Sequence, residues 1–212
     1  DISQVQETLN KKYDYMILIV EDDWDIRAYL QHELSGNFNV LVAENGAKAL
    51  DILLKENVSL VVSDVMMPNM DGIEMLQRIR KDFQISHIPV IILTAKGNDE
   101  AKTKAISMGA NAYIIKPFSK DYLVARIEQL LNERKLFRER VWQQPEEHKE
   151  EQDTYEQFLV KKDVQFIEKI HQVIEENLDN SDFNIDTIAS TIGLSRSAFF
   201  KKLKSLTGFA PV

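Results

Sequence analysis

The chain has 212 residues and carries a formal net charge of -8 at pH 7. At roughly 100 to 200 residues per domain, this length accommodates one large domain or two small ones. It contains no cysteine, which excludes disulfides, a thiol nucleophile and cysteine-ligated metal sites. No apolar run approaches the roughly 18 residues that span a bilayer, so we expect no membrane contact, and the lack of cysteine is compatible with the cytoplasmic location that we expect. Because the chain begins at Asp1 without a methionine, we interpret it as part of a longer polypeptide.

The acidity is unevenly distributed along the chain. Residues 1–138 have a net charge of -3, residues 139–160 of -5, and residues 161–212 of zero. The acidic average disfavours nucleic acid as a partner, because a DNA-binding surface must neutralise phosphates. The last twenty residues contain no acid, however, and four bases: Arg196, Lys201, Lys202 and Lys204. This basic end is compatible with a local nucleic-acid surface.

Between Tyr15 and about Asn132, short apolar runs alternate with segments of helical period. Near-continuous apolar strands that alternate with helices are typical of a parallel sheet covered on both faces. We therefore predict a doubly wound α/β domain with its ligand site at the carboxyl ends of the strands. Asn45 is expected to cap the helix that follows it. The candidate strands are residues 15–20, 39–43, 58–63, 88–93 and 111–116.

The rest of the chain is predicted to be mostly helical. An a/d-like seam after Asp121 has two interpretations: the helix packs on its own domain, or it pairs with a second copy to form a homodimer. A further amphipathic helix is predicted from Lys161 to near Leu178. Two short helices joined at Gly193 are predicted to follow it. Gly193 is expected to adopt the left-handed conformation, and Ser195 is expected to cap the last helix. The seam residues are Leu123, Ile127, Leu130, Phe137 and Val141. The predicted divisions are an N-terminal connector (1–14), the α/β domain (15–134), a helical and acidic linker (135–160) and a small all-α segment (161–212).

Carboxylates follow two of the predicted strands. Glu21 and Asp22 come directly after the first strand, and Asp64 follows the third. If these strands are neighbours in a parallel sheet, the three acids converge at one edge. They would repel one another unless a cation lay among them, and hard oxygen ligands suit Mg2+.

Two further polar residues end predicted strands at the same edge. Thr94 ends the fourth strand and Lys116 the fifth. A metal, a carboxylate, a hydroxyl and an ammonium together can place a phosphoryl group on a carboxylate. Asp64 would attack phosphorus, the metal and Lys116 would hold the equatorial oxygens, and Thr94 would donate to one of them.

These residues, in this order, closely resemble the receiver domain of two-component response regulators over about residues 15–134. The motifs are Glu21-Asp22, Asp64 in DVMMPNMDG, Thr94-Ala95 and Lys116-Pro117-Phe118. The resemblance implies strand order 2-1-3-4-5, a histidine kinase as partner and Asp64 as the phosphoacceptor. It also implies Mg2+ bound by Asp22, Asp64 and the Met66 backbone carbonyl, with Glu21 acting through bound water. Tyr113 matches the aromatic switch residue of this family, which turns inward when Thr94 engages the phosphoryl group.

We expect a switch and not an enzyme with a separate substrate. A phosphatase of the haloacid dehalogenase kind would need a second acid two residues after the nucleophile, and Met66 stands there. The expected chemistry is self-phosphorylation from a phosphohistidine donor and slow self-dephosphorylation. Met66 and Lys96 resemble the positions that tune hydrolysis in receivers, and apolar Met66 predicts a long-lived phosphoryl group.

The tract SRSAFFKKLKSLTGFAP closely resembles the first helix-turn-helix of AraC-type transcription factors. That family carries two such units, and the chain stops before the second, so promoter DNA is expected to bind through the complete C-terminal domain. The outward residues of the second helix are the candidate DNA contacts: Arg196, Ser197, Phe200, Lys201 and Lys204.

Two architectures remain open. One is an ordinary response regulator that controls transcription. The other is a hybrid sensor, anchored in the inner membrane, in which a kinase precedes Asp1 and the receiver serves as an interaction or phosphate-sink module without direct DNA binding by this segment.

Overall fold

The structure is a computed structural model that describes residues 13–95, 103, 105–143, 155–179 and 183–207. The side chains of residues 137–162 are not described. Residues 1–12 of the predicted connector, Lys96 and residues 144–154 of the predicted linker lie outside the described residues. The chain forms two compact units. The first comprises Asp1–Lys81 and Ile88–Glu133, and the second comprises Asp82–His87 and Arg134–Val212.

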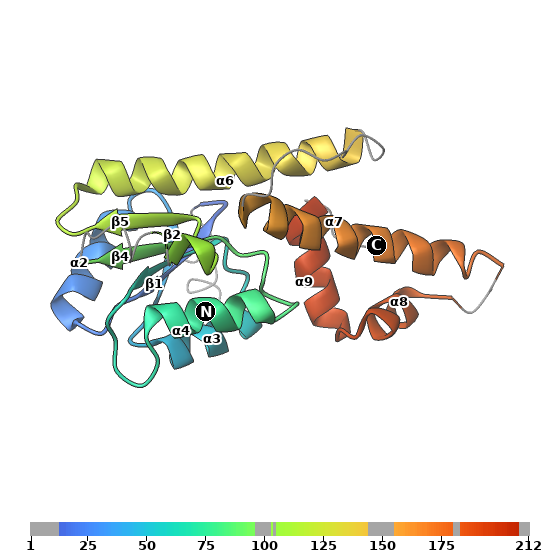
Figure 1. The fold of residues 1–212 in the computed structure, drawn as a ribbon, viewed down its shortest axis with the longest axis horizontal. Helices are drawn as coiled ribbons and strands as arrows, with labels where there is room; N and C mark the ends of the chain where they lie inside the picture. Colours follow the sequence, from blue (N-terminus) through green and yellow to red (C-terminus); the bar gives the residue numbers. More distant parts are fainter. Residues whose placement is uncertain (1–12, 96–102, 104, 144–154, 180–182, 208–212) are drawn as a thin grey trace, which may run out of the picture. The chain divides into compact units, whose positions relative to one another are not determined.

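The first unit is built on a parallel sheet in the order β2-β1-β3-β4-β5 (Figure 1). This order and the doubly wound fold confirm the prediction. The two central strands β3 and β4 are buried along their whole length, which explains why their sequences are almost uniformly apolar. The strands are β1 (Met16–Val20), β2 (Asn39–Ala43), β3 (Leu60–Asp64), β4 (Val90–Thr94) and β5 (Ala112–Ile115).

Four described helices flank this sheet: α2 (Trp24–Leu34), α3 (Gly46–Lys55), α4 (Gly72–Lys81) and α6 (Lys120–Gln143). All four begin at side-chain caps: Asp71 accepts from the Glu74 amide at 2.7 Å before α4, and Ser119 from the Tyr122 amide at 3.2 Å before α6. The Asp23 side chain accepts a hydrogen bond from the Ile26 amide at the start of α2, and Asn45 accepts one from the Lys48 amide at the start of α3, as predicted. Figure 1 shows α6 on one face of the sheet and α3 and α4 on the other.

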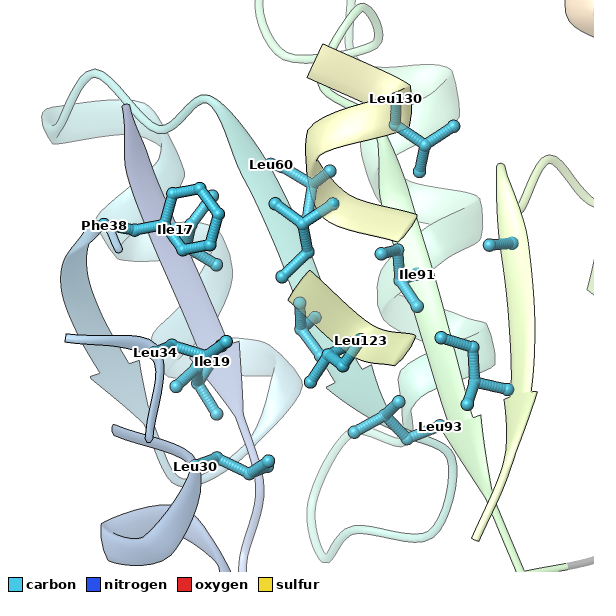
Figure 2. Close-up of a cluster of buried hydrophobic side chains, with 14 of the residues drawn as sticks. Ile17, Ile19, Leu30, Leu34, Phe38, Leu60, Ile91, Leu93, Leu123 and Leu130 are labelled. Atoms are coloured by element: carbon cyan, nitrogen blue, oxygen red, sulfur yellow. The ribbon is translucent and has the colours of Figure 1, made fainter. Parts of the chain in front are cut away.

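The helix α6 packs on its own domain through its first turns. Leu123, Ile127 and Leu130 are buried in the cluster that also contains Leu30 and Leu34 of α2. Figure 2 shows Leu123 and Leu130 lying over the strands that carry Ile17, Ile19, Leu60, Ile91 and Leu93. These three seam positions therefore belong to the core of the first unit. The side chains of the other two seam residues lie outside the described part.

The second unit contains α7 (Tyr155–Glu175), α8 (Ile185–Ile192) and α9 (Arg196–Thr207). Its core joins Phe166 and Ile170 of α7 to Ile188 of α8 and to Phe199 and Leu206 of α9. The helix α7 begins at Tyr155 and not at Lys161. Residues 155–160 (YEQFLV) lie at the end of the predicted linker but include Glu, Gln and Leu, which are good helix formers.

The junction of α8 and α9 is a tight turn. Gly193 has a φ of 82° and its amide donates to the Ser190 carbonyl at 3.0 Å, which ends α8 in the left-handed conformation predicted for this residue. The Ser195 hydroxyl accepts a hydrogen bond from the Ala198 amide at 3.3 Å, as expected of a helix cap. Two short helices are thus held at a fixed turn.

Lys202, one of the four bases of α9, is fully buried. Its ammonium donates to the Phe83 carbonyl at 2.5 Å and lies 3.9 Å from the Phe83 ring centroid and 5.0 Å from that of Phe166. This cation therefore contributes to the core of the second unit and is absent from the basic surface of α9. None of the helices in the described ranges combines the length and apolarity that a membrane span requires.

Candidate functional site

Three strand ends bring two carboxylates and an ammonium into contact. Glu21 follows β1, Asp64 ends β3, and Lys116 follows β5. The Lys116 Nζ lies 2.7 Å from Glu21 Oε2 and 2.5 Å from Asp64 Oδ1. Glu21 is 2 % exposed and Asp64 is 7 % exposed, so both hydrogen bonds are largely shielded from water. The site lies at the carboxyl ends of the parallel strands, where doubly wound sheets bind their ligands.

Asp64 is held by its own backbone surroundings as well. The second carboxylate oxygen, Oδ2, accepts a hydrogen bond from the Met66 amide at 2.6 Å. Met66 is 76 % exposed, so its backbone faces the site while its thioether lies in solvent. Thr94 is buried at the end of the neighbouring strand β4, and its carbonyl accepts from the Lys116 amide at 2.7 Å. Thr94 and Lys116 are therefore tied together through the backbone.

Burial and ion pairing act in opposite directions on the charged groups. Burial raises the pKa of Glu21 above its ordinary value, although the hydrogen bond and charge of Lys116 lower it in part. For Lys116, burial lowers the pKa, but the hydrogen bonds and charges of Asp64 and Glu21 outweigh burial, and the net shift is upward. Lys116 thus remains an ammonium when it bridges the two acids.

The remaining acids of the loop after β1 have different roles. Asp22 is exposed, whereas Asp23 caps α2 through its side chain. A residue that the sequence did not single out contacts this loop: Arg27 Nη1 donates to the carbonyls of Glu21 at 2.6 Å and Asp22 at 3.1 Å. The feature of the sequence that could have indicated this contact is a single basic residue, Arg27, in the first turns of the helix that follows three consecutive acids.

The donor chemistry of this site fits Mg2+. Its candidate ligands are all oxygens, which Mg2+ prefers, and the ammonium of Lys116 between Glu21 and Asp64 shows that these carboxylates take up a cation. In the structure as described, no three side chains of the His, Asp and Glu type already converge as a metal cluster.

Tyr113 lies on β5, next to the fourth strand. In the register of the two strands it pairs with Ile92, and Thr94 pairs with Ile115. Tyr113 is half-buried and lines an open cavity of about 360 Å3 together with Tyr122 of α6. The proposed switch residue thus has space beside it on the surface of the sheet.

The candidate DNA contacts on α9 differ in exposure. Arg196, Ser197 and Lys204 are exposed, whereas Phe200 and Lys201 are half-buried. Arg196 Nη1 lies 2.7 Å from Asp186 Oδ2 of α8, and its guanidinium carbon lies 5.4 Å from the Phe200 ring centroid. The guanidinium is therefore held in a defined direction at the amino end of α9.

A five-stranded sheet of order 2-1-3-4-5 with a lysine-bridged acidic pair at its carboxyl edge defines a receiver-type signalling domain. A sequence model described as "Response regulator receiver domain" matches residues 17–128, and the chain belongs to this family.

Solved receivers agree with this assignment. The receiver domain of the Francisella response regulator 1452 is 34 % identical, with a TM-score of 0.54 over 57 % of this chain and 98 % of that one. The signal receiver domain of a signal transduction histidine kinase from Syntrophus aciditrophicus is 30 % identical, with a TM-score of 0.53 over 56 % and 91 % of the two chains.

Longer relatives come from two kinds of protein. "Histidine kinase P4" of Formosa agariphila is 31 % identical over 211 residues, which are 100 % of this chain and 15 % of that protein. The "Uncharacterized transcriptional regulatory protein YrkP" of Bacillus subtilis is 35 % identical over 163 residues, which are 76 % of this chain and 64 % of that protein. The chain thus spans less than two thirds of either relative.

Proposed function

We propose that this chain is a phosphorylation-controlled signalling module in which Asp64 accepts a phosphoryl group from a histidine kinase. The observation that carries the proposal is the double contact of Lys116 with Glu21 and Asp64. A buried acid joined to an ammonium at the carboxyl edge of the sheet combines a nucleophile with a group that stabilises negative charge on a phosphoryl oxygen.

In the proposed transfer, a carboxylate oxygen of Asp64 bonds to phosphorus while the phosphorus–nitrogen bond of the donor histidine breaks. The leaving imidazole nitrogen keeps the electron pair and takes up a proton from solvent. Lys116 moves its hydrogen bond from Asp64 to a phosphoryl oxygen, and the Thr94 hydroxyl donates to another. The Met66 amide, now 2.6 Å from Asp64 Oδ2, fixes the carboxylate for the attack.

Mg2+ would be held by Asp22, Asp64 and the Met66 backbone carbonyl, with Glu21 acting through bound water. When bound, the ion supplies positive charge to the phosphoryl oxygens and lowers the repulsion between phosphate and carboxylates. Glu21, Asp22 and Asp64 together carry enough negative charge to require a cation in addition to Lys116.

The proposed output is transcription, through an AraC-type DNA-binding domain of which α8 and α9 form the first helix-turn-helix. The left-handed Gly193 and the Ser195 cap support this assignment, as does the exposed Arg196 at the start of α9. Arg196, Ser197 and Lys204 are the exposed candidates for contact with DNA, and the other two candidates, Phe200 and Lys201, are half-buried.

A second candidate function is supported by the relative in Formosa agariphila. Its similarity extends over the whole of this chain, including α7 to α9, and its printed name is that of a histidine kinase. In this alternative, the receiver belongs to a hybrid sensor and acts as an interaction or phosphate-sink module for the kinase.

The phosphoacceptor can be tested with a small-molecule donor. Acetyl phosphate and MgCl2 should add one phosphoryl group to the wild-type chain, as read by intact mass, and none to D64N. D51N, which changes an exposed acid on α3, is the matched control and should be phosphorylated like the wild type. Equal phosphorylation of D64N would contradict the proposal.

The two outputs separate in a gel shift with the parent protein that contains the complete C-terminal domain. A transcription regulator should change its DNA affinity when the phosphodonor is added. DNA affinity that is the same with and without phosphodonor would instead favour the phosphate-sink function.

A further inference from the structure

Arg27 makes contacts that the proposed phosphoryl chemistry does not use. It lies on α2, one turn after the acidic loop formed by residues 21–23, and its side chain folds back toward this loop. A single terminal nitrogen, Nη1, donates to two successive backbone carbonyls, those of Glu21 at 2.6 Å and Asp22 at 3.1 Å. Hydrogen bonds from a charged donor are stronger than those between neutral groups.

Other contacts fix the same loop. The Glu21 amide donates to the Ala43 carbonyl at 3.1 Å, and the Asp23 side chain accepts from the Ile26 amide at 3.0 Å. Arg27 holds the two carbonyls that lie between these anchors. A peptide plane held in one orientation restricts the backbone on either side of it, so these two hydrogen bonds limit the backbone conformations from which the Asp22 side chain projects.

We infer that Arg27 is a positioning residue that holds the acidic loop in the conformation that binds a divalent cation. The inference rests on the proposed magnesium site. Arg27 contacts backbone atoms of the loop and is not itself a ligand, in the manner of the outer partners that orient metal ligands in other proteins.

The sign of the effect distinguishes this role from simple electrostatics. Arg27 is a cation beside a cation site, so its charge alone opposes Mg2+ binding, and its removal would make binding tighter. If Arg27 positions the loop, its removal makes binding weaker because the ligands must be ordered when the metal binds. A change in either direction is therefore informative.

The test is a titration of the chain with MgCl2, followed by the amide chemical shifts of residues 21–23 and 64–66, with thermal unfolding of each variant in parallel. R27M removes the guanidinium. R78M is the matched control, because Arg78 is an exposed arginine on α4 whose ion pair with Glu74, at 2.7 Å, lies within one helix. R27K, which retains the charge, serves in place of R27M if that variant does not fold.

We expect R27M to raise the Kd for Mg2+ about tenfold, the size found when an outer partner of a metal ligand is lost. R27K should raise it at least about threefold, because an ammonium lacks the planar geometry of the guanidinium. R78M should leave the Kd within about twofold of wild type, since surface charges are screened. Unchanged or tighter binding by R27M, or by R27K in its place, overturns the inference. A wild-type chain without a saturable Mg2+ response overturns the proposed magnesium site itself, and so the two failures are distinguishable.

Discussion

Gly72 lies directly against the backbone carbonyl of Asp64. Its amide donates to the Val65 carbonyl at 2.9 Å, and a Cβ atom at position 72 would overlap the Asp64 carbonyl oxygen and come within 3.0 Å of Ser63 Oγ. The start of α4 is thus joined to the end of the strand that carries the proposed phosphoacceptor. Glycine is required here because of the close approach of two backbone segments.

Gly72→Ala should therefore affect stability and the site together. We expect a loss of about 1–3 kcal/mol in the free energy of unfolding, the range for inserting an atom into a packed region. Gly36→Ala is the control, because its Cβ would meet no atom closer than the Glu33 carbonyl oxygen at 3.9 Å. Urea unfolding measures both variants, and phosphorylation by acetyl phosphate should slow in G72A alone. Equal stabilities of G72A and G36A would be inconsistent with the close contact.

Lys116→Met removes the ammonium that bridges two buried carboxylates. The two acids would then face each other uncompensated, and we expect the metal-free protein to lose about 3 kcal/mol of stability. MgCl2 should raise the Tm of this variant more than that of wild type, because the metal replaces the missing cation. K120M is the control: Lys120 lies 3.4 Å from Glu33 in a solvent-accessible pair, whose loss should cost much less stability than the loss of Lys116. The idea fails if MgCl2 stabilises K116M no more than wild type.

The raised pKa of Glu21 predicts a pH dependence of stability. Between the ordinary value of 4.5 and its raised pKa, the folded protein binds more protons at this site than the unfolded protein does. The contribution of Glu21 to stability is therefore present below pH 4.5 and is lost as the pH rises through the raised pKa. The difference in unfolding free energy between wild type and E21Q, measured in magnesium-free buffer, should fall with rising pH.

Arg196 gives a prediction for the proposed DNA output. In the parent protein with its complete C-terminal domain, R196A should weaken specific DNA binding by about 1–3 kcal/mol, which is the usual cost of losing a contact with a base edge. Its effect on stability should stay below about 1 kcal/mol, because the pair with Asp186 is exposed. K169A, at an exposed position of α7, should leave specific binding unchanged. Equal loss of affinity in both variants would indicate only a general charge effect.

The sequence predicted the sheet because its strands are short apolar runs with polar residues at their carboxyl ends. Lys116 and Asp64 are 52 positions apart, yet parallel topology alone places them at one edge. Arg27 and Lys202 could not be predicted in this way, since both are charged residues of helices and a helical pattern alone would place them in solvent. Their partners are backbone carbonyls and aromatic rings, which leave no pattern in the spacing of charged residues.

Met66 is expected to determine the lifetime of the phosphoryl group on Asp64. Its side chain is 76 % exposed beside the acid, and a thioether is at best a weak acceptor for an attacking water. Met66→Asn would place an amide at this position, which can hydrogen-bond and orient the water, so phosphate should be lost faster from M66N than from wild type. Wild type should keep its phosphate for many minutes or longer, as followed by intact mass after the donor is removed. Loss within seconds from the wild-type chain, or equal lifetimes in the two proteins, would show that Met66 does not limit access of an ordered water to phosphorus.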